Sequence, residues 1–200
     1  STGDDILGNR LQKILHNNIK GNICISLSGG VDSMVLAFTL KRLEKKLDIN
    51  VSAFHIVYNN REESEVEKNL IMAYCKKINI PLYIHKILHI KRRSINRESY
   101  ENITREIRFT CYKKFDCPIV LGHISEDKVE NIITNFSTNK HMFDLEKIHL
   151  TSNIEGVHLI RPFINTEKTD IIQYSHKYKI PYLNNTTPDW SNRGKFRKDL

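Results

Sequence analysis

The sequence has no run of about 18 consecutive apolar residues, the length that a membrane-spanning helix needs. Its first ten residues also lack the basic segment followed by an apolar one that is typical of a secretory signal. No internal repeat, low-complexity tract or linker divides the chain. These absences predict a cytoplasmic protein with no membrane partner, folded as a single domain over residues 1–200.

Cysteine is scarce. The four cysteines stand at positions 24, 75, 111 and 117, no two of them form a C-x-x-C pair, and no histidine cluster completes a zinc pattern. The first three fall in apolar strand or helix patterns, where buried thiols are common. We interpret all four as reduced core residues.

Acidic residues are fewer than basic ones, and the formal net charge is +8. A positive excess suits a polyanionic partner such as a nucleic acid, because neutralised phosphates release counterions. A lysine-rich surface without any such partner would give the same total. Charge alone therefore leaves nucleic-acid binding open.

Short apolar runs alternate with helical patterns along the chain. Leu36, Leu40, Leu43 and Leu47 recur at helical spacing, as do Val66, Leu70 and Tyr74. The predicted strands span residues 22–27, 51–57, 82–88, 118–122 and 157–160, and further helical patterns cover 100–111, 129–136 and 167–179. This alternation predicts an α/β fold: an open, doubly wound parallel sheet of about five strands with helices on both faces.

The segment Ser28-Gly29-Gly30-Val31-Asp32-Ser33 joins the first strand to the first long helix. Paired glycines let the backbone turn tightly and approach a ligand, and successive amides at a helix N-terminus bind phosphate. A carboxylate at Asp32 would repel phosphate unless it holds a bridging Mg²⁺. The alternative is a purely structural role: a simple turn followed by an acidic residue that the helix dipole favours.

The segment matches neither G-x-x-x-x-G-K-[ST] nor G-x-G-x-x-G, which disfavours a kinase-type phosphate loop and a dinucleotide site. It resembles the Ser-Gly-Gly-x-Asp-Ser loop of the PP-loop ATP pyrophosphatases. The resemblance implies an adenine nucleotide hydrolase-like fold, the cofactors ATP and Mg²⁺, and cleavage of ATP between its α- and β-phosphates, with AMP transferred to a substrate oxygen.

Further segments resemble the tRNA(Ile)-lysidine synthetase branch of that superfamily. They are His55-Ile56-Val57-Tyr58-Asn59-Asn60-Arg61-Glu62-Glu63-Ser64, Glu101-Asn102-Ile103-Thr104-Arg105-Glu106-Ile107-Arg108-Phe109, Gly122-His123-Ile124-Ser125-Glu126-Asp127-Lys128-Val129-Glu130-Asn131, Arg161-Pro162-Phe163-Ile164 with Lys168 beyond, and Asn192-Arg193-Gly194-Lys195-Phe196-Arg197. Together they extend over most of the chain in the order of the branch.

This resemblance implies three groups of site residues. The expected catalytic residues are Asp32, Arg105, Asp127 and Glu130, and Asp32 is also the expected metal ligand. The expected ATP-binding residues are Ser28, Gly29, Gly30, Val31, Asp32, Ser33, His55 and His123. The residues expected to contact tRNA or phosphate are Arg61, Arg108, Arg161, Arg193, Lys195 and Arg197.

The residues also support a site on physical grounds. Asp127 and Glu130 are three apart at the start of a predicted helix, so they share one face, and Arg105 and Arg108 have the same spacing. Guanidinium groups that face carboxylates could hold a zwitterionic amino acid. Taken singly, these charges could equally form surface salt bridges, the two histidines could be packed core residues, and the basic tail could be a solvated segment.

The predicted function is an ATP-dependent ligase that adenylates the C2 oxygen of an anticodon cytidine in tRNA and joins lysine to it. Alternatives are a PP-loop tRNA thiolase, a non-catalytic nucleotide-binding module and an amidotransferase-type ligase. The chain ends where the branch usually continues, so no separate C-terminal tRNA-binding domain is expected. A homodimer and the identity of the amino acid stay open.

The sequence departs from the branch at four positions. Tyr58 and Ile124 stand where it has histidine, and Lys128 and Asn131 where it has Gln and Thr. Residues 137–148, STNKHMFDLEKI, replace a glycine-rich segment that is expected to shape the acceptor or tRNA pocket. The acceptor is therefore the least defined part of the prediction.

Overall fold

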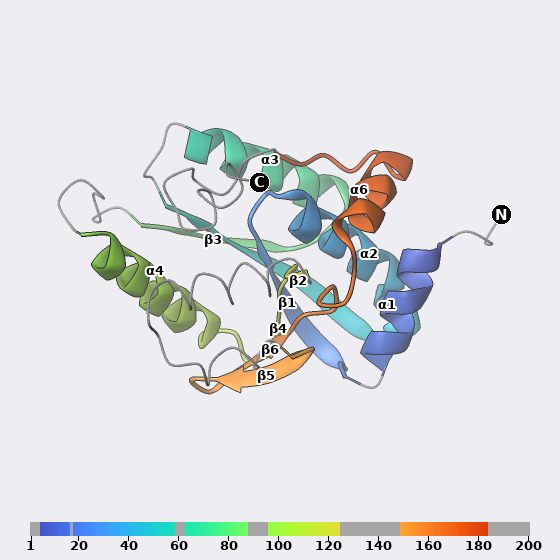
Figure 1. Ribbon diagram of the computed structural model, residues 1–200, viewed down its shortest axis with the longest axis horizontal. Helices are drawn as coiled ribbons and strands as arrows, with labels where there is room; N and C mark the ends of the chain where they lie inside the picture. Colours follow the sequence, from blue (N-terminus) through green and yellow to red (C-terminus); the bar gives the residue numbers. More distant parts are fainter. Residues whose placement is uncertain (1–4, 17, 59–62, 88–95, 125–148, 184–200) are drawn as a thin grey trace.

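The computed structural model describes residues 5–16, 18–58, 63–87, 96–124 and 149–183. Strands and helices alternate along these residues (Figure 1). In chain order the elements are α1 (Ile6–His16), β1 (Gly21–Leu27), α2 (Val31–Leu47), β2 (Ile49–Val57), α3 (Glu63–Lys77), β3 (Leu82–Lys86), α4 (Arg97–Tyr112), β4 (Ile119–Val120), β5 (Thr151–Ile154), β6 (Val157–Ile160) and α6 (Lys168–Lys177).

Six strands form one sheet in the order β3-β2-β1-β4-β6-β5. The pairs β3–β2, β2–β1, β1–β4 and β4–β6 are parallel, so their carboxyl ends meet at one edge of the sheet. β1 lies in the interior of this order, and its residues Ile23, Cys24 and Ile25 are fully buried. The predicted α/β class and the parallel sheet are confirmed.

Helices cover both faces of the sheet, as predicted. Alternate residues of β1 belong to different core clusters: Ile25 packs with residues of α1, α2, α3 and α6, whereas Cys24 packs with residues of α4. This alternation is the period of two that a strand imposes on its side chains. Figure 1 shows α4 on one side of the sheet and α1, α2 and α6 together on the other. Among the described residues, no helix has both the length and the apolar character to span a bilayer.

The sixth strand was not predicted. β5 pairs antiparallel with β6 through a two-residue turn, Glu155-Gly156, in which both residues have positive φ (53° and 83°). Such a turn matches the twist of an antiparallel hairpin. The sheet is therefore parallel except for this antiparallel pair at its β5 edge, which the sequence pattern did not predict.

α1 was also missed, although its buried residues Leu7, Leu11 and Leu15 recur at a spacing of four. Asp5 caps this helix, because the Gly8 amide donates to its carboxylate at 2.8 Å. The same carboxylate lies 3.0 Å from the Arg42 guanidinium of α2. The predicted helix over 129–136 lies outside the described residues.

Candidate functional site

The loop after β1 lies where the connections of the sheet change face. β1 connects to β2 through α2 on one face, and the chain returns from β3 to β4 through α4 on the other. In the strand order the chain continues from β1 to β2 on one side and from β4 to β5 and β6 on the other, so the order reverses between the neighbours β1 and β4. In open α/β sheets such a switch point forms the ligand crevice. The predicted phosphate loop, residues 28–33, begins directly after β1 at this point.

The shape of the loop requires glycine at position 29. Gly29 has φ +80°, which side-chain-bearing residues rarely adopt, and a Cβ there would lie 3.1 Å from Cγ of Glu67 in α3. Its carbonyl accepts a hydrogen bond of 3.0 Å from the Leu183 amide. The turn is thus held between α3 and the segment that follows α6.

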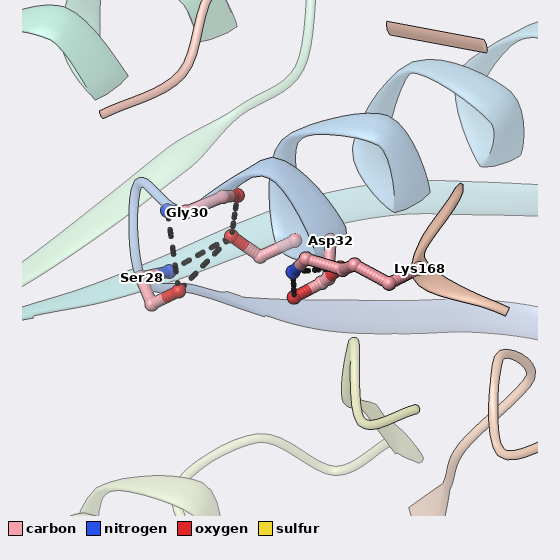
Figure 2. A network of polar contacts seen from close by, with 5 residues as sticks. Ser28, Gly30, Asp32 and Lys168 are labelled. Carbon is pink, nitrogen blue, oxygen red and sulfur yellow. Dashed lines mark hydrogen bonds and ion pairs between the residues drawn. The ribbon is translucent and has the colours of Figure 1, made fainter. Parts of the chain in front are cut away.

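The two serines of the loop form one network with its backbone (Figure 2). The Ser33 hydroxyl donates to the Gly30 carbonyl at 3.0 Å and accepts from the Ser28 amide at 3.2 Å. The two hydroxyl oxygens are 3.2 Å apart, and the Gly30 amide reaches Ser28 Oγ at 3.4 Å. These bonds fold the loop back onto the start of α2.

α2 begins with an N-terminus suited to an anion. Its N-cap is Gly30, in extended conformation, which has no side chain to bond the first-turn amides. Those amides and the helix dipole favour negative charge at this position. A triphosphate placed here would meet backbone donors in an arrangement typical of phosphate sites.

Asp32, in the first turn of α2, forms an ion pair with Lys168, the first residue of α6. The ammonium lies 2.8 Å from Oδ1 and 2.7 Å from Oδ2, so it bonds both carboxylate oxygens. About a quarter of each side chain is exposed (23% and 28%). Figure 2 shows the pair beside the serine network, at the start of α2. The carboxylate predicted to hold a metal ion therefore already holds a cation.

Gly122 joins the segment after β4 to the loop. A Cβ at Gly122 would lie 3.0 Å from the Ser33 amide nitrogen and 3.1 Å from the Asp32 carbonyl carbon. These are backbone atoms of the first turn of α2, and they cannot move aside without distorting it. Only glycine allows this approach, which places the Gly122-His123 segment against the loop.

His55 lies on β2 next to Leu27, the residue before the loop, and is 2% exposed. Its Nδ1 is 2.9 Å from the Leu27 carbonyl, which can only accept, so Nδ1 carries the proton. Nε2 is buried and has no hydrogen-bond partner among the described residues. Burial lowers the pKa of His55 below its ordinary value of 6.5. Near neutral pH the ring is thus uncharged, with Nε2 an acceptor.

The predicted arginines occupy different surroundings. Arg108 of α4 donates to the Tyr58 hydroxyl at 2.9 Å, just after β2. Arg105 lies 3.6 Å from Glu155, in the turn at the amino end of β6, whereas the loop follows the carboxyl end of β1. That contact does not bring Arg105 to the loop. Its catalytic role, and the contact of Arg108 with RNA or phosphate, stay predictions.

Arg161 is 5% exposed and makes bonds within the protein. Its guanidinium donates to the Ser152 hydroxyl at 2.8 Å and to the His149 carbonyl at 3.2 Å, which ties β5 to the end of β6. This arrangement serves the structure, and its contact with tRNA or phosphate stays a prediction. His123 is half-buried after β4. The remaining predicted residues, Arg61, Asp127, Glu130, Arg193, Lys195 and Arg197, lie outside the described residues.

Lys168 was not among the predicted site residues, although it was noted after Arg161-Pro162-Phe163-Ile164. It stands 136 positions from its partner Asp32, so no local spacing could link the two. The signal that could have found it is its place at the start of a helix that follows a strand end, because such positions gather at the ligand edge of a parallel sheet.

The fold and the loop define a class: α/β proteins that bind a nucleotide phosphate at a glycine-containing turn after the first strand of a parallel sheet. The sequence profile of the PP-loop domain matches residues 4–198. The chain belongs to the PP-loop family.

Several relatives match most of the chain at low identity. A tRNA(Ile)-lysidine synthase of Malacoplasma penetrans is 29% identical over 86% of this chain and 58% of its own length. That of Nitrosomonas europaea is 28% identical over 80% and 35%. A bifunctional TilS/HprT protein of Listeria innocua is 25% identical over 89% and 28%. The chain thus spans about a quarter to just over half of the length of these relatives.

Solved structures share the fold at lower identity. A U34-tRNA thiolase, NcsA, from Methanococcus maripaludis with its [4Fe-4S] cluster has a TM-score of 0.74 at 18% identity, over 96% of this chain and 69% of that one. The NMN synthetase of Francisella tularensis has a TM-score of 0.58 at 16% identity, over 88% and 68%. Both support the adenine nucleotide hydrolase-like arrangement.

Replacement of Gly122 tests the packing of the loop. We expect Gly122→Ala to lower the free energy of unfolding by about 1–3 kcal/mol, because the new methyl group must displace the backbone of α2. Urea denaturation of the variant and of the parent protein measures this difference. An unchanged unfolding midpoint would show that the two segments can separate without cost.

The burial of His55 predicts a pH dependence of stability. Its folded pKa is lowered, so the unfolded chain takes up a proton more readily, and stability should fall as pH decreases below 6.5. Above pH 6.5 the loss of stability caused by protonation of His55 in the unfolded chain should be absent. Urea denaturation between pH 5 and 8 should show a shallower pH dependence in His55→Gln than in the parent protein. His176→Gln, which removes an exposed histidine of α6, is the control, and equal slopes in all three proteins would refute the assignment.

Proposed function

We propose that this protein is an ATP-dependent tRNA-modifying ligase that activates a tRNA base by adenylation and joins an amino acid to it, lysine being the favoured amino acid. One observation carries the proposal: the amides and hydroxyls of the loop after β1 converge at the start of α2, beside the carboxylate of Asp32. Two relatives that are named tRNA(Ile)-lysidine synthase and match 86% and 80% of the chain support lysine as the amino acid.

The reaction consists of two displacements. In the first, the C2 oxygen of an anticodon cytidine attacks the α-phosphorus of ATP, the bond between that phosphorus and the bridging oxygen breaks, and pyrophosphate leaves. In the second, the amine of lysine attacks the activated C2 carbon and AMP leaves. Both steps transfer charge to phosphate oxygens, which preorganised donors stabilise.

The described residues fit the first displacement. The amides of the first turn of α2 and the Ser28 hydroxyl would bind phosphate oxygens, and the Ser33 hydroxyl would do so by releasing the Gly30 carbonyl. His55, neutral near pH 7, would accept a hydrogen bond from the nucleotide through Nε2. Asp32 fits a magnesium ion, because one carboxylate together with phosphate oxygens is a common magnesium site and because it already binds a cation. A bound Mg²⁺ would stabilise negative charge on the phosphates.

The second displacement depends on residues whose roles are proposals from the family resemblance. Asp127 and Glu130 would orient the lysine ammonium and accept its proton, and Arg105 would bind the lysine carboxylate. Arg105 would have to leave Glu155, an exposed ion pair that costs little to break. The basic residues Arg193, Lys195 and Arg197 would contact phosphates of ATP or tRNA.

The thiolase alternative draws support from the fold of NcsA. The cysteines of this chain argue against it. Cys24, Cys75 and Cys111 are buried, and burial raises the pKa of Cys24 to about 12 and that of Cys75 to about 11. Because the thiolate is the nucleophile, buried and protonated thiols are poorly suited to attack a substrate. For a cluster, the sequence also lacks a C-x-x-C pair. A ligase is therefore the better account.

Removal of the Asp32 carboxylate tests ATP chemistry at the loop. We expect Asp32→Asn to reduce substrate-dependent pyrophosphate release by about 100-fold or more, because it removes a charge that acts on the phosphates. A coupled pyrophosphate assay with bulk tRNA and lysine measures the rate. Asp170→Asn removes an acidic residue from the first turn of α6 and serves as the control. Equal rates for Asp32→Asn and the parent protein would refute a catalytic loop.

A screen of substrates tests the acceptor and the amino acid. We expect pyrophosphate release with tRNA, and aminoacyl incorporation into tRNA with lysine alone among the twenty amino acids. Incorporation of another amino acid would show that the protein is a ligase with a substrate other than lysine. Transfer of labelled sulfur to tRNA would favour the thiolase, and ATP binding without release under any condition would favour a non-catalytic nucleotide-binding module.

A further inference from the structure

Lys168 occupies the position that the proposed function assigns to a metal ion. Its ammonium bonds both oxygens of Asp32, at 2.8 and 2.7 Å, and so lies where a cation bound to both oxygens would lie. A divalent ion needs at least one of these oxygens at about 2.0–2.1 Å if it is Mg²⁺. An ion on either oxygen would lie close to the ammonium, and the two positive charges would repel each other. The ammonium and the ion therefore compete for the carboxylate.

The backbone around Lys168 is held in place, so that only its side chain is free to change position. In the turn before α6, the Thr166 amide donates to the Phe163 carbonyl at 2.8 Å, and after α6 the Leu183 amide donates to the Gly29 carbonyl of the loop. Ile171, one turn into the helix, is fully buried against the core. An ammonium released from Asp32 would therefore stay within reach of the loop on its flexible four-carbon stem.

The charges explain why the protein would keep a cation there. Without Lys168, the negative charge of Asp32 would lie beside the amides that are to bind a triphosphate, and like charges repel. With Lys168 bound, the carboxylate is neutralised and the positive end of the α2 dipole is left to act on the phosphate. The pair is partly shielded from solvent, so screening by water does not remove the effect (23% and 28% exposed).

We propose that Lys168 is a positioning residue of the ATP site: it serves as the resident counter-ion of Asp32, gives way when a divalent cation binds that carboxylate, and then faces the phosphates. This inference rests on the proposed function for the identity of the ligand. It goes beyond that function in two ways. Asp32 binds first the Lys168 ammonium and then a divalent cation, and a residue of α6 takes part in the site.

Metal binding in the absence of nucleotide tests the competition directly. Mn²⁺ is the probe, and its binding to the whole chain is followed by electron paramagnetic resonance of the free ion. We expect Lys168→Met to bind Mn²⁺ about tenfold more tightly than the parent protein, because the ammonium no longer competes with the ion for the carboxylate. The double variant Lys168→Met, Asp32→Asn should lose this gain.

Nucleotide binding without metal should change in the opposite direction. In the presence of EDTA, calorimetry should show that Lys168→Met binds ATP about tenfold more weakly than the parent protein, since Lys168 no longer offsets the negative charge of Asp32. Lys168→Arg, which keeps the charge, should restore most of this affinity. The two opposite shifts distinguish a shared cation position from general damage to the site, which would weaken both.

The matched control is Lys41→Met. Lys41 lies farther along α2 and forms an ion pair of 2.6 Å with Glu44, at similar exposure (24% and 23%). It should leave both affinities as in the parent protein. Lys168→Gln serves if Lys168→Met does not fold, as judged by circular dichroism.

Unchanged Mn²⁺ affinity in a folded Lys168 variant would overturn the inference. That outcome together with substrate-dependent pyrophosphate release by the parent protein would leave the proposed function intact. Tighter Mn²⁺ binding in the variant, without pyrophosphate release by the parent under any substrate, would support the shared position and reject the ligase.

Discussion

Burial of β1 between two parallel neighbours is the constraint on which the rest of this structure depends. Its backbone donors and acceptors are paired on both sides, with β2 over seven residues and with β4 over two. Its side chains are packed on both faces. The chain can leave such a strand only at its end, where it must turn at once into the covering helix, and the turn at Gly29 with its φ of +80° makes this possible.

The same turn determines the electrostatics of the site. It places the N-terminus of α2 at the edge of the sheet, where a dipole, a set of amides and the Asp32 carboxylate meet. A carboxylate there opposes the dipole's attraction for phosphate unless a cation accompanies it. Lys168 supplies that cation from a separate element and offsets the charge of the Asp32 carboxylate.

Much of this architecture could be predicted from the sequence, because its causes are local. The leucines between positions 36 and 47 identify the buried face of α2, and the loop at 28–33 lies between a strand and a helix as expected. The apolar pattern located α3 but did not define its buried face: Val66 is 59% exposed, whereas Tyr74 and Ile71, which lies outside that pattern, are buried. Lys168 meets Asp32 through the topology of the sheet, which no spacing along the chain reveals.

The bond from Leu183 to Gly29 has a consequence for biosynthesis. The phosphate loop is complete in the nascent chain once α2 has been made, but its counter-ion comes 136 residues later, and the backbone donor to Gly29 later still. During translation β1 and α2 are therefore made well before the residues that complete the contacts of the loop. The packing of α6 against α2 brings the two parts of the chain together.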